Sequence, residues 1–518
     1  MATLATLPNN THATWFKDPS LRRNVMAATF MYFGSFALGY DGSYLNGLQA
    51  LSTWNEYFDT PTGNRLGLIS ASSYLPGLVL LPTFSWACDH LGRRIAAAIG
   101  CVLIIVGSIV GAVAKNEGTL IAGRCIVGTA TSLAILACNL LLNEILHPRL
   151  RSVGSAFFLA GYYIGSTTSA WITYGIVASN WKSEWSWRLP TLLQALGPVV
   201  VLIGLLIVPE SPRWLIAHGK RDKAHMVLAA HHANGDLDDP LVCHEMVEIE
   251  EALAREKRDK AGIRTFFATK GNRHRLVILV TVALGSQCNG VSLFSYYLAP
   301  VMRTIGIASP TQQLGINGGL NIFNLFWACF GAVTCERFGR RTLWIYATAG
   351  MVLCYAALIG LSAGYADKGT AGLGYGVIVF IFLCFGCYDV AWTPLSYSYP
   401  TEVLPYSLRA SGMAAFVWLQ YAAVVFNQWV NPVALDAAGW KWYFFFFVVL
   451  LILLALILWK FPETKGLSLE EVSLIFDDNN GGRSLREKKE AVDAEFKLGS
   501  KQTDVRHIED GEKDAESV

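Results

Sequence analysis

Apolar residues gather into twelve long runs, each long enough to cross a lipid bilayer as a helix. A bilayer core about 30 Å thick needs roughly 20 apolar helical residues. The runs of the first half extend over residues 25–45, 66–87, 95–114, 119–142, 154–178 and 190–208, and those of the second half over 276–298, 314–335, 343–363, 373–397, 411–430 and 443–459. Because the runs are continuous and do not alternate, they favour helices over barrel strands. We therefore expect an all-α membrane protein.

The polar stretches between the runs divide the chain into five parts. We expect a cytoplasmic N-terminal segment (1–24), a six-helix bundle (25–208), a cytoplasmic linker with short helices (209–275), a second six-helix bundle (276–460) and a cytoplasmic tail (461–518) that is largely disordered after residue 477. Arginines cluster in every second loop between the predicted spans, for example at Arg93 and Arg94 and at Arg340 and Arg341. The positive-inside rule then predicts that both termini face the cytoplasm.

Composition excludes several other classes of protein. Only 15% of the residues are charged, against about 25% in soluble domains, and the formal net charge of +2 offers no basic surface for nucleic acid. The sequence holds no metal-ligand cluster, phosphate-binding glycine loop or nucleophile with a placed base. We expect neither an enzyme nor a protein with a cofactor or metal ion.

Charged motifs recur in the same order in each half. Residues 89–94 (DHLGRR) reappear as 336–341 (ERFGRR), Glu144 with Arg151 reappears as Glu402 with Arg409, and PESPR at 209–213 is echoed by PETKG at 462–466. Six spans duplicated in parallel predict two bundles related by an axis along the membrane normal, with a substrate site near the midplane between them.

These repeated charges lie where helix ends would meet at the cytoplasmic side. Ordinary solvation of loops would explain any one of them. We hypothesise instead that the acids pair with the arginines when the inner gate is closed, because a network of weak pairs can bias an equilibrium of a few kcal/mol. The candidate gate residues are Asp89, Arg93, Arg94, Glu144, Arg151, Glu210, Arg213, Glu336, Arg340, Arg341, Glu402 and Arg409.

Several of these motifs resemble a known family. GRR at 92–94, PESPRWL at 209–215 and PETKG at 462–466 resemble the sugar porters of the major facilitator superfamily, and GYDG at 39–42, HPR at 147–149, WSWRLP at 185–190 and NPVALD at 431–436 are similar to the fungal lactose permease and related fungal sugar transporters. The resemblance implies a fold of twelve transmembrane helices in two bundles, a functional monomer, and transport of a sugar or similar polyhydroxy compound.

Two ionisable residues of the first half lie deep in apolar runs. Asp41 and Arg124 are expected to pair, since an unpaired charge there costs several kcal/mol. The resemblance implies proton symport, in which protonation of Asp41 releases Arg124 and lets the loaded transporter reorient. The alternative is a permanent ion pair that holds two helices together. Asp389 in the tenth run is a candidate for gating or for plain helix packing.

A sugar site needs amides and hydroxyls for hydrogen bonds and aromatic faces for the C–H side of the ring. The resemblance implies that substrate is bound by Gln287, Asn289, Ser292, Tyr296, Tyr297, Asn324, Trp392, Tyr397, Gln420 and Asn427. Hydrogen bonding within the helix core is the alternative for each of them. Leu159 stands where hexose porters of the family carry a binding glutamine, which favours the disaccharide group and equally allows a less hydroxylated solute.

The leading interpretation is a multi-pass plasma-membrane symporter that imports protons with a sugar, for example the disaccharide lactose or cellobiose. A transporter of the same fold for a pentose, polyol, quinate-like acid or specialised metabolite is the first alternative. A non-transporting sugar sensor is the second, and it is weakened by a tail of only about forty residues after Phe476.

Overall fold

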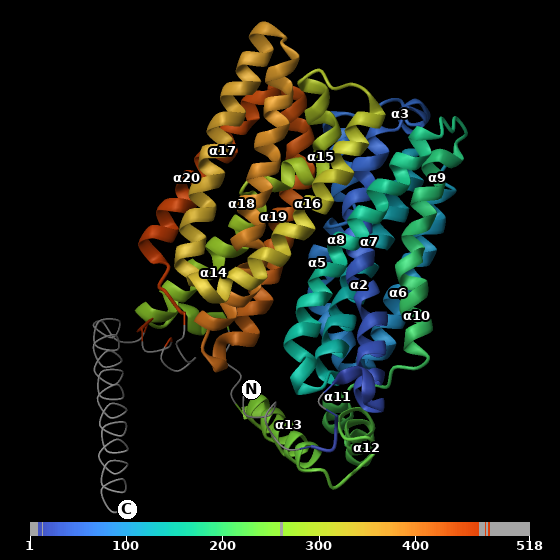
Figure 1. Cartoon of the computed structure of the whole chain (residues 1–518), viewed down its shortest axis with the longest axis vertical. Helices are drawn as coiled ribbons and strands as arrows, with labels where there is room; N and C mark the ends of the chain where they lie inside the picture. The colour runs from blue at the N-terminus through green and yellow to red at the C-terminus, as the bar shows by residue number, and fades with distance from the viewer. Residues whose placement is uncertain (1–8, 13, 259–262, 466–471, 473–474, 477–518) are drawn as a thin grey trace, which may run out of the picture.

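The computed structural model describes residues 9–12, 14–258, 263–465, 472, 475 and 476. Its described part is helical and contains no strand, so the all-α prediction is confirmed. The helices form two bundles that stand side by side (Figure 1).

The first bundle contains α2 (Pro19–Ala50), α4 (Gly63–Ala71) with α5 (Leu75–Leu91), α6 (Arg93–Ala112), α7 (Glu117–Ile145), α8 (Pro148–Ala178), and α9 (Trp185–Leu192) with α10 (Leu196–Leu205). The second contains α14 (Lys270–Cys288) with α15 (Val291–Thr304), α16 (Pro310–Phe338), α17 (Arg340–Lys368), α18 (Ala371–Val403), α19 (Tyr406–Ala438) and α20 (Tyr443–Lys460). Each bundle therefore supplies six membrane spans.

Hydropathy separates the inner spans from the outer ones. Eight helical stretches of the described residues are long and apolar enough to cross a membrane, and one of them, Ser407–Lys460, holds both α19 and α20. The spans α2, α8 and α16 are not among these stretches, and α8 packs against both of the others at the centre of the molecule. Their polar residues are accommodated because they face another helix and not lipid.

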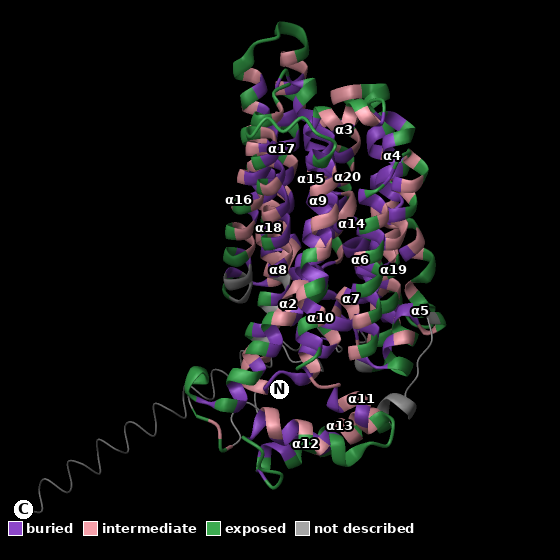
Figure 2. Cartoon of the chain, turned by 90° about the vertical axis from the view of Figure 1, so that its right-hand side faces the viewer, coloured by how far each residue is buried: buried purple, intermediate pink, exposed green. Residues whose placement is uncertain are grey.

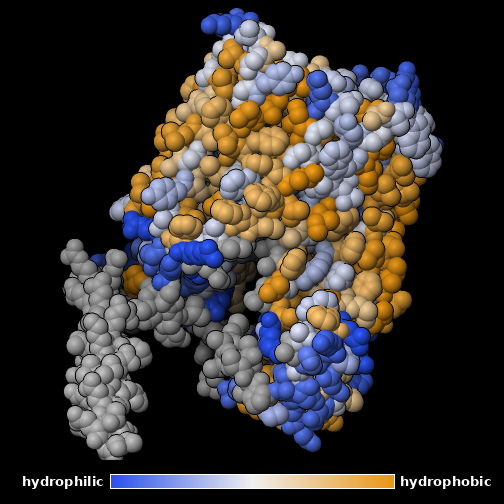
Figure 3. All heavy atoms as spheres, viewed as in Figure 1, coloured by the Kyte–Doolittle hydropathy of each residue, from blue (hydrophilic) through white to orange (hydrophobic). Residues whose placement is uncertain are grey.

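The outer surface is apolar, as a bilayer requires. Leu206, Leu353 and Trp459 are each more than 70% exposed. Figure 3 shows hydrophobic residues over the sides of both bundles and hydrophilic residues gathered at the two ends. The apolar sides of the bundles thus mark the part of the surface that a bilayer would cover.

Three shorter helices form a layer beyond one end of the spans (Figure 2): α11 (Pro212–Ala217), α12 (Arg221–His232) and α13 (Pro240–Arg258). The layer is attached to the first bundle by hydrogen bonds. Ser20 donates its hydroxyl to the Ala230 carbonyl over 2.9 Å, and a ring nitrogen of His232 lies 2.9 Å from the Ile145 carbonyl oxygen. The three helices that connect the two bundles in sequence are therefore attached to the first bundle.

The seventh span is broken between α14 and α15. Gly290 adopts a left-handed conformation with φ +92°, which glycine tolerates best. The Asn289 side chain accepts a hydrogen bond from the Val291 N–H over 3.1 Å and so satisfies a backbone donor at the start of α15. The two segments can point in different directions because no helical hydrogen bonding continues through this turn.

Candidate substrate and proton sites

The repeated charged motifs adopt the same local structure in both halves. Glu210 accepts hydrogen bonds from the backbone N–H groups of Arg93 and Arg94, and Glu463 accepts from those of Arg340 and Arg341, at 2.8 to 3.1 Å. A carboxylate at a helix N-terminus is stabilised by these N–H groups and by the helix dipole. Burial nevertheless raises the pKa of Glu210.

Side-chain ion pairs complete each motif within its own half. Arg93 lies 3.0 Å from Glu144, and Arg340 lies 3.2 Å from Glu402. These pairs join neighbouring helices of one bundle. Four of the residues predicted for the gate are thus paired within their own half in this arrangement, while pairing across the two halves stays a prediction.

The remaining gate candidates make mostly local contacts. Asp89 at the end of α5 lies 3.4 Å from Arg93 at the start of α6, Arg151 lies 3.7 Å from Glu245 of α13, and Arg213 also has an interaction partner. Three further arginines donate to backbone carbonyls, namely Arg94 to Leu205, Arg341 to Leu458 and Arg409 to Leu404. The side chain of Glu336 lies outside the described part of the structure.

Asp41 and Arg124 do meet inside the first bundle. Both are about 95% buried, and the Arg124 Nη1 lies 3.9 Å from the Asp41 Oδ1. At this distance the pair is loose. Arg124 gains a shorter hydrogen bond from its Nε to the Ile69 carbonyl, 2.7 Å away, and Gln194 donates to Asp41 over 3.4 Å. Asp41 is therefore held near a cation without a close contact.

A cluster of polar side chains surrounds the break in the seventh span. Asn427 donates to the Gln287 carbonyl over 3.0 Å, and Gln420 donates to the Ser286 hydroxyl over 2.9 Å. Tyr397 in turn donates to the Gln420 carbonyl oxygen over 2.8 Å. Two amides of α19, a hydroxyl of α18, and the Ser286 hydroxyl and Gln287 backbone carbonyl of α14 thus come together, while their role in binding substrate stays a prediction.

Four other predicted substrate residues are buried away from this cluster or use their polar atoms in contacts within the protein. Trp392 is fully buried in the second bundle, where its ring packs edge-on against Trp344 at 4.5 Å between centroids. Ser292 donates to the Gln287 carbonyl over 2.9 Å, and Tyr297 donates to the Gln428 carbonyl over 2.6 Å. Asn289 caps α15. For these four residues the contacts favour the alternative of core hydrogen bonding or packing.

Asn324 and Tyr296 keep capacity for a ligand. Asn324 is 5% exposed, and its Oδ1 has no hydrogen-bond partner among the described residues. The Tyr296 hydroxyl lies 3.5 Å from the hydroxyl of Tyr74, which belongs to the other half. The Leu159 side chain, important for the expected substrate size, is outside the described positions.

Sequence reasoning missed several residues that join the two halves at mid-depth. Tyr163 of α8 donates to Asp389 of α18 over 2.7 Å, Ser166 donates to Asn321 over 2.9 Å, and Tyr421 donates to Ser132 over 2.8 Å. Isolated hydroxyls in apolar runs give little signal, since most of them bond to their own helix. Tyr163 could have been identified only from its lying at the same depth in the membrane-spanning region as Asp389.

The halves also touch at the end of the spans away from the layer of α11 to α13. Asn46 donates to the Ser295 carbonyl over 3.3 Å, Gln49 donates to the Tyr296 carbonyl over 3.1 Å, and Trp429 donates to Asn64 over 2.8 Å. Toward the layer of α11 to α13, by contrast, the pairs Arg93–Glu144 and Arg340–Glu402 each stay within one bundle, and Figure 3 shows the surface hollowed between the halves. The halves are therefore joined at the end away from this layer and parted at the end that carries it.

The arrangement offers amides, hydroxyls and aromatic rings near one buried carboxylate and one buried guanidinium. Such groups can hydrogen-bond a polyhydroxy solute and can respond to a proton. Among the described residues, no group of three or more His, Cys, Asp or Glu side chains is placed to hold a metal ion.

Comparison with known proteins gives consistent matches over most of the chain. The family described as "Sugar (and other) transporter" matches residues 27–476. The MFS-type transporter criB of Aspergillus cristatus is 29% identical over 86% of this chain and 91% of its own length, and the high-affinity glucose transporter of Kluyveromyces lactis is 26% identical over 85% and 83%.

Solved structures share the fold. The inward open conformation of the xylose transporter XylE from E. coli matches with a TM-score of 0.73 at 20% identity, covering 87% of this chain and 99% of that one. Its sugar-bound form, described as a proton:xylose symporter bound to 6-bromo-6-deoxy-D-glucose, matches with a TM-score of 0.70 at 22% identity, covering 88% and 99%. The twelve-helix fold is thereby confirmed.

The family match covers far more than half of the residues and includes both bundles and the layer between them. The protein is therefore a multi-pass membrane transporter, not an enzyme, and it belongs to the Sugar (and other) transporter family, the sugar porters of the major facilitator superfamily.

Proposed function

We propose that this protein is a proton-coupled sugar importer of the plasma membrane, with both termini in the cytoplasm. The observation that carries the proposal is the loose, buried pair of Asp41 and Arg124 in the bundle opposite the amide cluster. A transporter needs a group whose charge changes with the proton, and a buried carboxylate next to a cation is such a group.

The mechanism follows from the contacts of this pair. When Asp41 is ionised, its attraction holds Arg124 between α2 and α7. When it takes up a proton, Arg124 keeps only its bond to the Ile69 carbonyl and its place over the Tyr44 ring, 5.5 Å from the centroid. The helices are then free to shift relative to one another, and the loaded transporter reorients.

The substrate side of the proposal rests on Gln287, Gln420, Asn427, Asn324 and Tyr397. They combine amide donors and acceptors with one aromatic hydroxyl, which suits vicinal hydroxyls of a sugar. The K. lactis relative is by its name a glucose transporter. The wider choice of lactose or cellobiose rests on the fungal motifs alone.

Inner gating belongs to the same proposal. The pairs Arg93–Glu144 and Arg340–Glu402 exist while the halves are parted inside. We expect some of these charges to exchange partners across the seam when the inner side closes. Each exchange contributes little by itself, but several act together on an equilibrium of a few kcal/mol.

A second candidate is a less hydroxylated solute. Tyrosines are frequent at the centre, with the Tyr162 and Tyr163 rings 5.4 Å apart and the Tyr74 and Tyr296 rings 6.3 Å apart. Aromatic walls of this kind suit a flatter, more apolar metabolite as well as a sugar ring.

The test is uptake of labelled lactose, cellobiose, glucose and xylose by transporter-deficient yeast, with and without a protonophore. We expect uptake that collapses with the protonophore and in Asp41→Asn, because the amide takes up no proton. Surface expression of the variant is the control. Uptake indifferent to both would make Asp41 a structural partner of Arg124, and no uptake of any sugar would favour the second candidate.

A further inference from the structure

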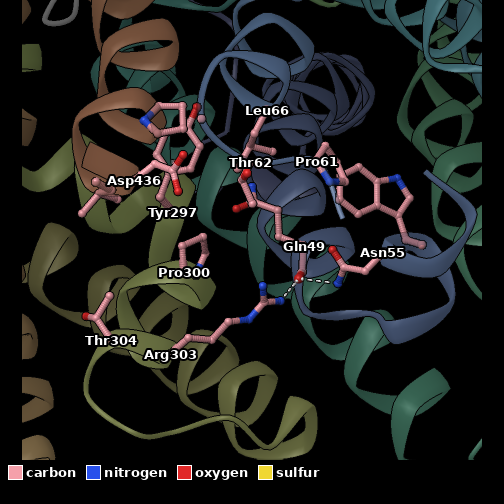
Figure 4. A pocket seen from close by; sticks show the side chains of 14 residues that line it. Gln49, Asn55, Pro61, Thr62, Leu66, Tyr297, Pro300, Arg303, Thr304 and Asp436 are labelled. Carbon is pink, nitrogen blue, oxygen red and sulfur yellow. Dashed lines mark hydrogen bonds between the residues drawn. The ribbon is translucent and has the colours of Figure 1, made fainter. Parts of the chain in front are cut away.

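A pocket of about 180 Å³ opens at the outer end of the seam between the bundles (Figure 4). Gln49 and Thr62 line it from the first half, and Tyr297, Arg303 and Asp436 line it from the second. One ordered water needs about 10–15 Å³ of such space, so the pocket has room for on the order of ten waters. A small organic solute fits the same space.

Gln49 lines this pocket and carries an unused acceptor that is buried in the pocket wall. The residue is 2% exposed, and its amide nitrogen is engaged with the Tyr296 carbonyl over 3.1 Å. Its carbonyl oxygen has no hydrogen-bond partner among the described residues, and Figure 4 shows the side chain extending toward the middle of the lining. A buried oxygen without a donor is costly, so a ligand hydroxyl at this position would be favoured.

The other lining groups complete an amphipathic site. Asp436 is exposed and offers carboxylate oxygens, while Arg303 uses one nitrogen to bind the Gln49 backbone carbonyl and carries further N–H groups. Tyr297, Pro300 and Pro432 provide apolar surface between them. Acceptors and donors around an apolar wall match a ring that carries several hydroxyls.

We propose that this outer pocket binds a small polyhydroxy solute and that the bound solute holds the outer side closed. The choice of solute class rests on the proposed function. Because the lining comes from both halves, the solute contacts all of it only while the halves are together, and binding therefore favours that state. A high external concentration of solute then slows import, since fewer molecules open to the outside.

The experiment compares uptake curves of labelled lactose and glucose over a wide range of external concentration. Thr62→Trp fills the pocket, and Thr370→Trp is the matched control. Both threonines precede a helix on the outer side without capping it, and Thr370 does not line the pocket. We expect uptake by the unchanged protein and by Thr370→Trp to decline at high concentration, and we expect this decline to be lost in Thr62→Trp.

Binding is measured separately on the purified full chain by saturation-transfer NMR with glucose and lactose. In a Gln287→Ala background, which removes one polar side chain of the proposed substrate site, we expect transfer to persist and to be lost when Thr62→Trp is added. This result would support the outer site even if no sugar is transported. Equal uptake curves for all three proteins, with no transfer in the Gln287→Ala background, would mean that the pocket holds only water and would overturn the proposal.

Discussion

Buried polar residues carry most of the chemistry of this molecule, and they differ in how well the sequence predicts their contacts. Asp41 and Arg124 could be paired from the sequence because both interrupt long apolar runs. The bond between Tyr163 and Asp389 could not, since a tyrosine in an apolar run is compatible with any of several neighbours. Asn289 was expected to bind substrate, but its capping role depends on a helix break that hydropathy does not reveal.

Replacing Tyr163 with Phe removes a hydrogen bond between the halves while preserving the ring. Asp389 then keeps only the Thr393 hydroxyl, 2.8 Å away. We expect a loss of about 1 kcal/mol from the state closed outside, seen as greater labelling of cysteines introduced on the outer side. The matched control is Tyr346→Phe, because Tyr346 is 74% exposed on the surface. Equal labelling of the two variants would contradict this role of Tyr163.

At the scale of whole helices, the spans were predictable to within several residues because each contains a run rich in apolar residues, although α2, α8 and α16 are less apolar than the others. Their close contacts were only partly predictable. The glycine pair Gly161 and Gly165 of α8 packs against α2, where Gly161 faces the Tyr32 carbonyl and Gly165 the Phe36 carbonyl. Spacing alone cannot distinguish such a glycine from one that faces open space.

Gly165→Ala and Gly175→Ala test this distinction within one helix. A methyl group at Gly165 would overlap the Phe36 carbonyl oxygen, whereas one at Gly175 would have no atom within 4 Å. We expect Gly165→Ala to destabilise the protein by about 1–3 kcal/mol through forced separation of α2 and α8. Gly175→Ala should leave the melting temperature in detergent unchanged or slightly raised, and similar melting temperatures would argue against the close contact.

The attachment of α12 and α13 to the first bundle should depend on pH. Burial lowers the pKa of His147 to about 3 and that of His231 to about 4. An unfolded histidine titrates near 6.5, so between that pH and the lowered values the unfolded chain binds protons that the folded one does not. Stability contributed by these neutral rings is thus present above pH 6.5 and is lost as the pH falls.

Hydrogen exchange of α12 and α13 between pH 7.5 and 5, corrected for the intrinsic rate, measures this loss. We expect protection to decrease toward pH 5 and the decrease to be smaller in His231→Asn. His244→Asn serves as the control because His244 of α13 is exposed. Protection that is constant over this range would show that the two buried rings do not govern the attachment.

For the molecule as a whole, the duplication of the charged motifs in the sequence corresponds to two structurally matching helix ends, one in each bundle, on the side of the α11–α13 layer. Gly92 and Gly339 have φ values of +101° and +89° at the same point of each motif. The two ends are equal in design but not in burial, since the side chain of Arg93 is 10% exposed and that of Arg340 is 20% exposed. The sequence could predict the repeat, whereas the difference depends on packing.

Glu144→Gln and Glu402→Gln should therefore differ in their effects. Each removes the nearest carboxylate of an arginine, although Asp89 stays 3.4 Å from Arg93. The cost of a poorly compensated charge increases with burial. We expect Glu144→Gln to lower the melting temperature more than Glu402→Gln, with Glu250→Gln, on the exposed Arg221 pair, as control. A larger effect of Glu402→Gln would show that burial does not set the strength of these pairs.

The broken seventh span has a mechanical consequence. α15 carries Tyr296, Tyr297 and Arg303, which meet the first half on the outer side or line its outer pocket, while α14 carries Gln287 at the amide cluster. Gly290 lies between them and is the point at which α15 can rotate relative to α14. α15 can therefore close the outer entrance while the rest of the second bundle keeps its place. Substrate binding through α14 and closure through α15 are then separable functions of one span.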